Sequence, residues 1–89
     1  MLKVTDSAKK ELSRIIKENA EDSSEGLRVD LNDENELGLI LDQIKENDHI
    51  IKSKSGKAIL LISPEIYEAL ASFKVDYSIE AGITINEVE

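Results

Sequence analysis

The apolar residues of this chain come in short runs, and this feature limits the fold more than any other. In residues 27–31 and 75–79 apolar and polar side chains alternate, which is typical of strands with one buried face. Residues 37–42 are a further strand candidate, and the polar connection between them and 27–31 predicts a hairpin. Residues 58–62 are apolar throughout, as expected for a central strand. A sheet therefore has to form much of the core.

Two segments have the periodicity of helices instead. Apolar side chains recur every three or four positions after Thr5, whose hydroxyl can cap the first turn, and they predict a helix to about Asn19. Ser63 and Pro64 have the pattern of a second helix start, which predicts a shorter helix to about Ala71. Both helices are amphipathic and should lie on the surface of the sheet.

The remaining apolar runs complete the expected fold. Short strands are predicted at residues 2–4, 49–54 and 83–85, and Ser55-Gly56 should form a tight turn before the strand at 57–62. The expected fold class is α+β and sheet-dominated, with about seven short strands and two helices. A chain of 89 residues has room for one modest core, so a single domain over residues 1–89 is expected.

The absence of cysteine excludes several kinds of chemistry. With no Cys in the sequence, disulfides, thiolate metal sites and cysteine nucleophiles are excluded. No apolar run is long enough to span a membrane and the start of the chain lacks a secretion signal, so a cytoplasmic location is expected.

The acidic residues are concentrated in one part of the chain. Residues 18–48 contain eleven acids and two bases, Arg28 and Lys45, whereas the rest of the chain is close to neutral. Such a segment repels phosphate, so neither nucleic acid nor an anionic membrane is an expected partner. Mutual repulsion is expected to raise the pKa of some of these carboxyl groups and to favour stability near pH 5 to 6 over pH 8.

Two kinds of site were considered among the polar residues. His49 is the only histidine, and neither a second ligand nor the context of a catalytic nucleophile accompanies it, so an enzyme is not expected. Clustered carboxylates attract hard cations, and iron or calcium could bind in the acidic segment. The carboxylates that would bind it are Asp30, Asp33, Glu34 and Glu36.

Some apolar residues are left over once the core is assigned. If Leu37, Leu39 and Leu41 face inward, Ile40 faces the other side of the same strand. Ile50 and Ile51 are adjacent and cannot both point into one core. A homodimer or partner-binding face that includes Ile40 and one of Ile50 or Ile51 is therefore predicted.

Several motifs, taken in order, resemble those of a known family. These stretches are VTDSA at residues 4–8, GLRV at 26–29, LGLILD at 37–42, NDH at 47–49, LISP at 61–64 and VDY at 75–77. Together they resemble the A-type iron-sulfur cluster carriers, the HesB-like family, over essentially the whole chain. The resemblance implies the fold of that family, a small sheet-dominated α+β domain.

The resemblance also shows what this sequence lacks. The family carries a G-G-C-S-G segment where this chain has residues 32–36, and the family continues into a C-terminal C-G-C motif where this sequence ends at Glu89. None of the three ligand cysteines is present, so no cluster-binding residue can be carried over and no cofactor is expected. The two functions left open are a non-enzymatic interaction module linked to iron-sulfur metabolism and a carboxylate-based metal-binding protein.

Overall fold

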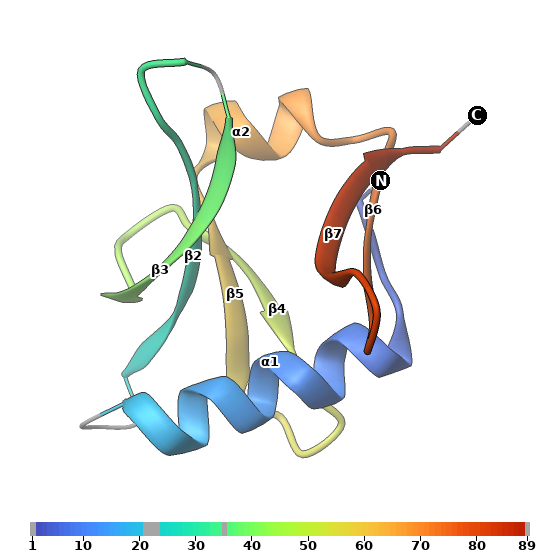
Figure 1. Ribbon diagram of the computed structural model, residues 1–89. Helices are drawn as coiled ribbons and strands as arrows, with labels where there is room; N and C mark the ends of the chain where they lie inside the picture. The colour runs from blue at the N-terminus through green and yellow to red at the C-terminus, as the bar shows by residue number, and fades with distance from the viewer. Residues whose placement is uncertain (1, 21–23, 35, 89) are drawn as a thin grey trace.

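The elements of the chain follow the expected order. The computed structural model describes residues 2–20, 24–34 and 36–88, and Figure 1 shows their arrangement. The described elements are β1 (Lys3–Val4), α1 (Asp6–Asn19), β2 (Glu25–Leu31), β3 (Leu37–Gln43), β4 (His49–Lys52), β5 (Ala58–Ile62), α2 (Pro64–Ala69), β6 (Phe73–Ser78) and β7 (Gly82–Glu87). The predicted class, a sheet-dominated α+β fold, is confirmed.

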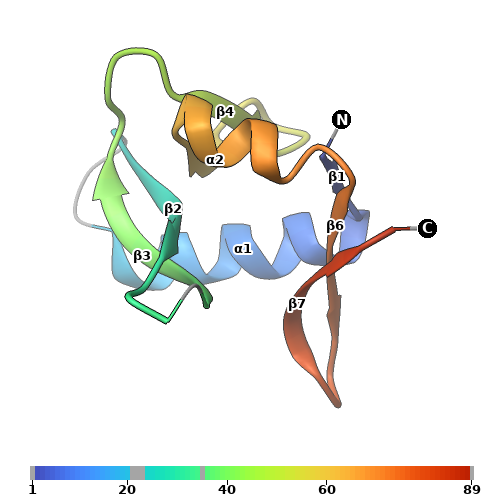
Figure 2. The ribbon, with the colours of Figure 1, turned by 90° about the horizontal axis from the view of Figure 1, so that it is seen from above.

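The strands form two sheets. One contains four strands in the order β3-β2-β5-β4, and the other contains three in the order β1-β6-β7. The hairpins β2-β3 and β4-β5 were expected from their connections, and both are antiparallel pairs. The short N-terminal strand β1 pairs in parallel with β6, far along the sequence. In Figure 1, α1 passes across the lower end of both sheets, whereas α2 lies toward their opposite end. Figure 2 shows α2 beside β4.

The capping prediction for α1 is confirmed. Thr5 has extended backbone angles, and its Oγ1 accepts a hydrogen bond of 3.2 Å from the Ala8 backbone N–H. The same hydroxyl donates to Asp76 Oδ1 on β6 at 2.8 Å. Ala8 and Leu12 on the inner face of the helix are fully buried. One threonine therefore begins the helix and also ties it to the three-stranded sheet.

The core lies between the two sheets and the helices. The predicted central strand β5 lies inside the four-stranded sheet, and its residues from Ile59 to Ile62 are buried. Leu27, Val29 and Val75 complete the buried centre. Among the described residues no helix is long and apolar enough to cross a membrane.

Three local details differ from the expectation. Ser63 precedes α2 but its side chain makes no capping hydrogen bond, and α2 ends at Ala69 instead of Ala71. Ile79 does not continue the alternation of β6; it lies in the turn before β7 and is 93% exposed. Alternation predicts which face a residue occupies within a strand, but it does not predict where the strand ends.

The four-stranded sheet has an inner and an outer face. Side chains of directly paired residues lie on the same face, and Leu27 pairs with Leu41 and Leu60, which belong to or pack against the core. Arg28, one residue along, pairs with Ile40 and Leu61, so these three lie on the opposite, outer face. The connection of residues 44–48 joins the two edge strands β3 and β4, and it passes over this outer face.

Candidate functional site

Arg28 is a charged residue that is almost wholly buried, with 9% of its surface exposed. The alternation of residues 27–31 predicts a solvent-facing position, and this expectation was wrong. The strand is instead buried on both faces from Gly26 to Val29. A Cβ at Gly26 would lie 3.2 Å from the Leu61 side chain on β5, so a larger residue there would force that leucine to shift. The outer face is thus closely packed around the Arg28 side chain.

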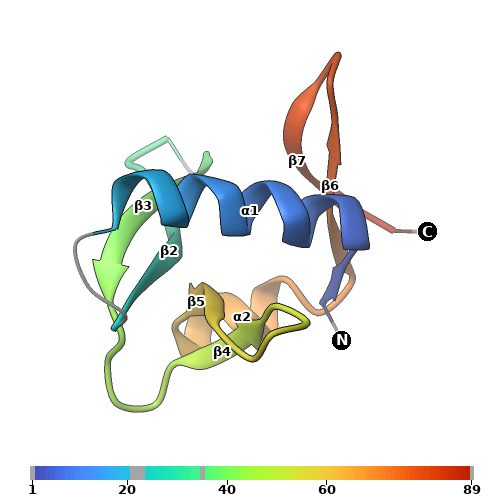
Figure 3. The same ribbon diagram turned by 90° about the horizontal axis from the view of Figure 1, so that it is seen from below.

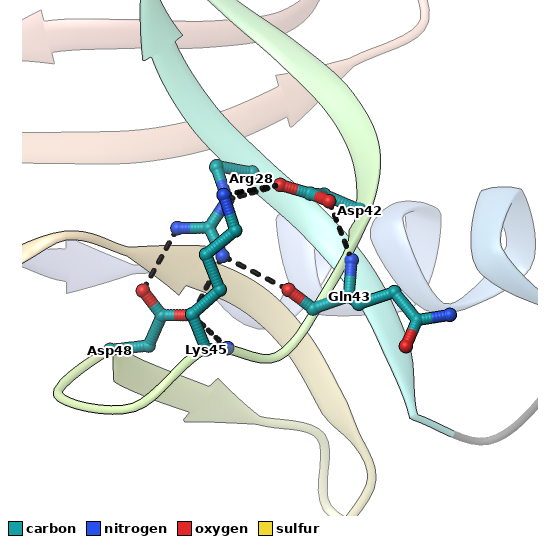
Figure 4. Close-up of polar contacts among 5 residues, drawn as sticks. All are labelled: Arg28, Asp42, Gln43, Lys45 and Asp48. Carbon is teal, nitrogen blue, oxygen red and sulfur yellow. Dashed lines mark hydrogen bonds and ion pairs between the residues drawn. The ribbon is translucent and has the colours of Figure 1, made fainter.

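The guanidinium of Arg28 is held by two carboxylates and a carbonyl, as Figure 4 shows. Its Nε donates to Asp42 Oδ2 at 2.7 Å. Nη1 and Nη2 donate to the two oxygens of Asp48 at 2.8 and 2.7 Å, which is a bidentate pair. Nη2 also donates to the Gln43 carbonyl at 3.1 Å. We call Arg28, Asp42 and Asp48 the arginine cluster.

The connection between β3 and β4 has the shape needed to deliver Asp48 to Arg28. Asn47 has a φ of 73°, in the left-handed region where Gly and Asn are tolerated. Asp48 then points inward with 3% of its side chain exposed, and its Oδ2 also accepts from the Lys45 backbone N–H at 2.8 Å. The carboxylate therefore closes its own turn and caps the arginine.

The arginine cluster reverses the expected effect of acidic repulsion. The pKa of Asp48 is lowered, mainly because its carboxylate accepts hydrogen bonds from Arg28, and burial opposes this only in part. The pKa of Asp42 is lowered by Arg28 first and by the Gln43 backbone N–H second. For these two acids, the expectation of raised pKa values was wrong. The reason is that Arg28 is buried against these two carboxylates instead of lying in solvent.

The second group of acids lies near the end of β2 and in the connection between β2 and β3. We call Asp30, Asp33, Glu34 and Glu36 the acidic loop; all four are exposed. The Asn32 side chain organises this loop, because its Oδ1 accepts from the backbone N–H groups of Glu34 and Glu36, each at 2.9 Å. The Asn32 N–H donates to the Glu36 carbonyl at 3.0 Å. The loop is a closed polar turn.

The geometry of the acidic loop gives no metal centre among the described residues. In residues 2–20, 24–34 and 36–88, no three His, Cys, Asp or Glu side chains lie close enough together to hold a metal ion. The ring of His49 stacks on the ring of Tyr67 of α2 instead, with the two centroids 3.9 Å apart. The metal-binding hypothesis for the acidic loop stays a prediction.

The three isoleucines predicted for an interface lie on different faces. Ile40 on β3 is 48% exposed and Ile50 on β4 is 37% exposed, and both belong to the outer face. Ile51 faces inward and packs against the core. Ile40 and Ile50 lie on opposite edge strands, about 14 Å apart if three strand spacings separate them. Ile44, in the connection between these strands, is 39% exposed.

The fold defines the class of protein that this chain resembles. Two sheets of four and three strands, with helices after the first and fifth strands, are the architecture of the A-type iron-sulfur carriers that the sequence motifs suggested. The expected resemblance is thus confirmed for the fold. No protein-family model and no curated protein matches the sequence.

Two solved structures carry this conclusion. Escherichia coli SufA, described as involved in the biosynthesis of iron-sulfur clusters, has a TM-score of 0.69 and 15% identity over 97% of this chain and 84% of its own. IscA, solved with a [2Fe-2S] cluster, has a TM-score of 0.63 and 19% identity over 98% of this chain and 85% of its own. At these identities the likeness establishes the fold alone.

The motifs that suggested the family come together in structural clusters. Arg28 from GLRV, Asp42 from LGLILD and Asp48 from NDH form the arginine cluster. Thr5 from VTDSA and Asp76 from VDY form the hydrogen bond between α1 and β6. Sequence reasoning missed both clusters, although the position of Arg28 as one of two bases among eleven acids was a signal that it neutralises some of them. The residues of these motifs therefore hold elements of the fold together.

Proposed function

We propose that this protein is a non-enzymatic interaction module that uses the A-type carrier fold, acts in connection with iron-sulfur cluster biogenesis, and holds no cluster itself. The link to cluster biogenesis is supported by the structural similarity to SufA, whose described role is in that process. The absence of cluster binding is supported by the ligand chemistry of the chain. The interaction role is supported by the exposed isoleucines of the outer face.

The observation that carries the proposal is the composition of the β2-β3 connection. The family resemblance places a ligand cysteine there, whereas this chain has Asn32, Asp33, Glu34 and Glu36 among residues 32–36. Carboxylate and amide oxygens are hard ligands, and iron-sulfur clusters are held by thiolates. The side-chain oxygen of Asn32 moreover already accepts two hydrogen bonds from backbone N–H groups of the loop. The donor set does not fit a cluster.

Anaerobic reconstitution tests the absence of a cluster. The purified protein would be incubated with ferrous iron, sulfide and a thiol reductant, desalted, and examined by visible absorption and iron analysis. We expect no absorption that persists after desalting, whereas a cysteine-containing carrier treated in parallel becomes coloured. A stoichiometric cluster spectrum would contradict the proposal and would require an unusual ligand set.

Light scattering tests the interaction role of the outer face. At about 100 μM, a dimer of micromolar affinity would be mostly associated. If the outer face mediates self-association, Ile40→Lys reduces the mass to that of a monomer, because it places a charge in an apolar contact. The matched control is Ile79→Lys, which changes an even more exposed isoleucine in the β6-β7 turn. A monomeric wild type would remove the self-association half of the proposal and leave a heterologous partner.

A carboxylate-based iron or calcium site is the alternative function. It would use Asp30 near the end of β2 together with Asp33, Glu34 and Glu36 from the connection that follows, all of which face solvent. No arrangement of the described side chains favours it over the interaction role. Calorimetric titration with each ion distinguishes the two, because only the alternative predicts saturable binding.

A further inference from the structure

A lysine-rich part of the surface lies between α1 and the turn that joins β4 to β5. Two adjoining hollows of about 330 and 260 Å³ occur here, and both are lined by Ser13 of α1 and by Ser53 and Ser55 of the turn. Figures 1 and 3 show this turn beside the helix. Because the two hollows share these three residues, they form one groove, which we call the basic groove.

The basic groove is positively charged although the whole chain has a net charge of −8. The lysines that line it are Lys9, Lys10, Lys17, Lys54 and Lys57. The acid among the lining residues is Asp6, whose Oδ2 lies 3.8 Å from Lys54 Nζ. Ile16, Ala58 and Ile59 supply apolar wall in the second hollow. The groove therefore combines cations and hydroxyl groups with a partly apolar wall.

One wall of the basic groove is held rigid by its own hydrogen bonds. In the β4-β5 turn the Ser53 N–H donates to the Lys57 carbonyl at 2.8 Å, and the Gly56 N–H donates to the Ser53 carbonyl at 3.0 Å. Gly56 has a φ of 87°, which the turn requires. The Ser53 and Ser55 hydroxyls are 2.9 Å apart. A ligand would meet a turn that is already ordered, which lowers the entropic cost of binding.

The other wall sets the length of the ligand. Asp6, Lys9, Lys10, Ser13 and Lys17 recur at three- and four-residue spacings, so they lie along one side of α1. The distance from the first to the last is about 16 Å at 1.5 Å per residue. An extended peptide of about five residues has the same length.

We propose that the basic groove binds an extended, carboxylate-rich peptide segment of a partner protein. Five lysines complement several carboxylates, and the serine hydroxyls can donate to the carboxylates or to the peptide backbone. This inference rests on the proposed interaction role and names the chemistry of a partner for it, at a surface separate from Ile40 and Ile50.

Two other occupants fit the basic groove less well. A single-stranded nucleic acid would need aromatic side chains on which its bases stack, and none lines the described groove. A second copy would have to insert its acidic loop, but Asn32 closes that loop into a turn and prevents an extended conformation. An acidic segment of another protein avoids both difficulties.

Fluorescence anisotropy tests the proposal with a labelled hexaglutamate peptide as the probe. In about 50 mM salt we expect saturable binding, and about 300 mM salt should weaken it because screening is stronger. Lys10→Glu with Lys57→Glu should weaken binding about tenfold, because two attractions become repulsions. The matched control is Lys3→Glu with Lys74→Glu, which changes the net charge equally on β1 and β6 and should change the affinity by less than about twofold.

Each alternative result contradicts a different part of the proposal. No binding of hexaglutamate at about 1 mM would remove it, since such an affinity is too weak for recognition. Equal losses in both double variants would show a general charge effect in place of a groove. Tighter binding of an oligothymidylate than of hexaglutamate would favour nucleic acid, and self-association abolished by Lys10→Glu with Lys57→Glu would favour a second copy. Equal melting temperatures of the variants establish that they are folded, and the reconstitution experiment tests the proposed function separately.

Discussion

The arginine cluster and the acidic loop lie in the same acidic part of the sequence but have opposite surroundings. In the cluster, Asp42 and Asp48 converge on Arg28, and the Asp48 side chain is 3% exposed. In the acidic loop, four carboxylates face solvent around a turn that Asn32 holds together. The difference is due to the two connections, since one crosses a sheet face over a buried base and the other is a simple hairpin.

A high density of acids along a sequence does not by itself mean that those acids repel one another in the folded protein. Repulsion among the eleven acids was expected, but Asp42 and Asp48 are attracted to Arg28. Strand β2 places Arg28 beneath the connection that carries Asp48. A single buried base lowers the pKa values of these two acids, which repulsion alone would raise.

Replacing the buried arginine should have the largest effect. Arg28→Met leaves Asp48 buried without its cation, and we expect a loss of about 3 kcal/mol in the free energy of unfolding. Urea denaturation measures this loss. Arg14→Met is the control, because Arg14 pairs with Glu11 and Glu18 on the exposed side of α1 and its loss should be small.

A second variant keeps this prediction testable if Arg28→Met does not fold. Arg28→Met with Asp48→Leu removes both buried charges, and an apolar pair of similar volume should recover part of the stability. Equal stability of wild type and Arg28→Met would mean that the arginine cluster contributes nothing to the fold.

Acid titration should show the arginine cluster and not the acidic loop. The folded-state pKa values of Asp42 and Asp48 are lowered from 3.8, so their contribution is present at neutral pH and is lost as the pH falls below about 4. The melting temperature should therefore fall on acidification. Asp48→Asn should flatten this dependence, whereas Glu34→Gln in the acidic loop should leave it unchanged. Greater stability at pH 5 than at pH 7 would restore the repulsion hypothesis.

The order of the acidic loop should depend on Asn32. Asn32→Ala removes the acceptor of the Glu34 and Glu36 backbone N–H groups, and each bond contributes about 1 kcal/mol. We expect faster amide exchange at these two residues with little change in global stability, because the loop is exposed. Asn32→Asp retains the acceptor and is the matched control. Unchanged exchange in Asn32→Ala would mean that the loop is ordered by other contacts.

Metal binding by the acidic loop should give the smallest effect. Titration of the protein with calcium or ferrous iron is expected to give only heats of dilution, because separated carboxylates in a turn do not form a coordination shell. The comparison is the variant with Asp33→Asn and Glu34→Gln. Saturable binding that this variant loses would establish the alternative function, with the acidic loop as the metal-binding site.

The secondary structure was largely predictable because it depends on local patterns. The apolar periods, the Thr5 cap and the Ser55-Gly56 turn each act over a few residues, and the corresponding elements are present. The division into two sheets was not predictable in this way. The pairing of β1 with β6 joins positions more than seventy residues apart, and no local signal marks it.

The candidate site was less predictable than the fold. Alternation placed Arg28 in solvent, because it cannot show that a connection five residues long crosses the outer face and buries the side chain. The exposure of Ile40 followed correctly from its position opposite Leu39 and Leu41, since a strand alternates regardless of its surroundings. The basic groove was missed because its lysines come from two distant segments, each unremarkable alone.

The hydrogen bond between Thr5 and Asp76 has a consequence for how the chain is made. The two residues are separated by 71 positions, so at about 5 to 20 residues per second Asp76 is synthesised roughly 4 to 14 s after Thr5. During that interval α1 can pack on β2 and β5, whose residues are already complete by Ile62. The N-terminal strand, however, has no partner until β6 emerges. The four-stranded sheet can therefore assemble on a nascent chain, and β1 is among the last elements to reach its final position.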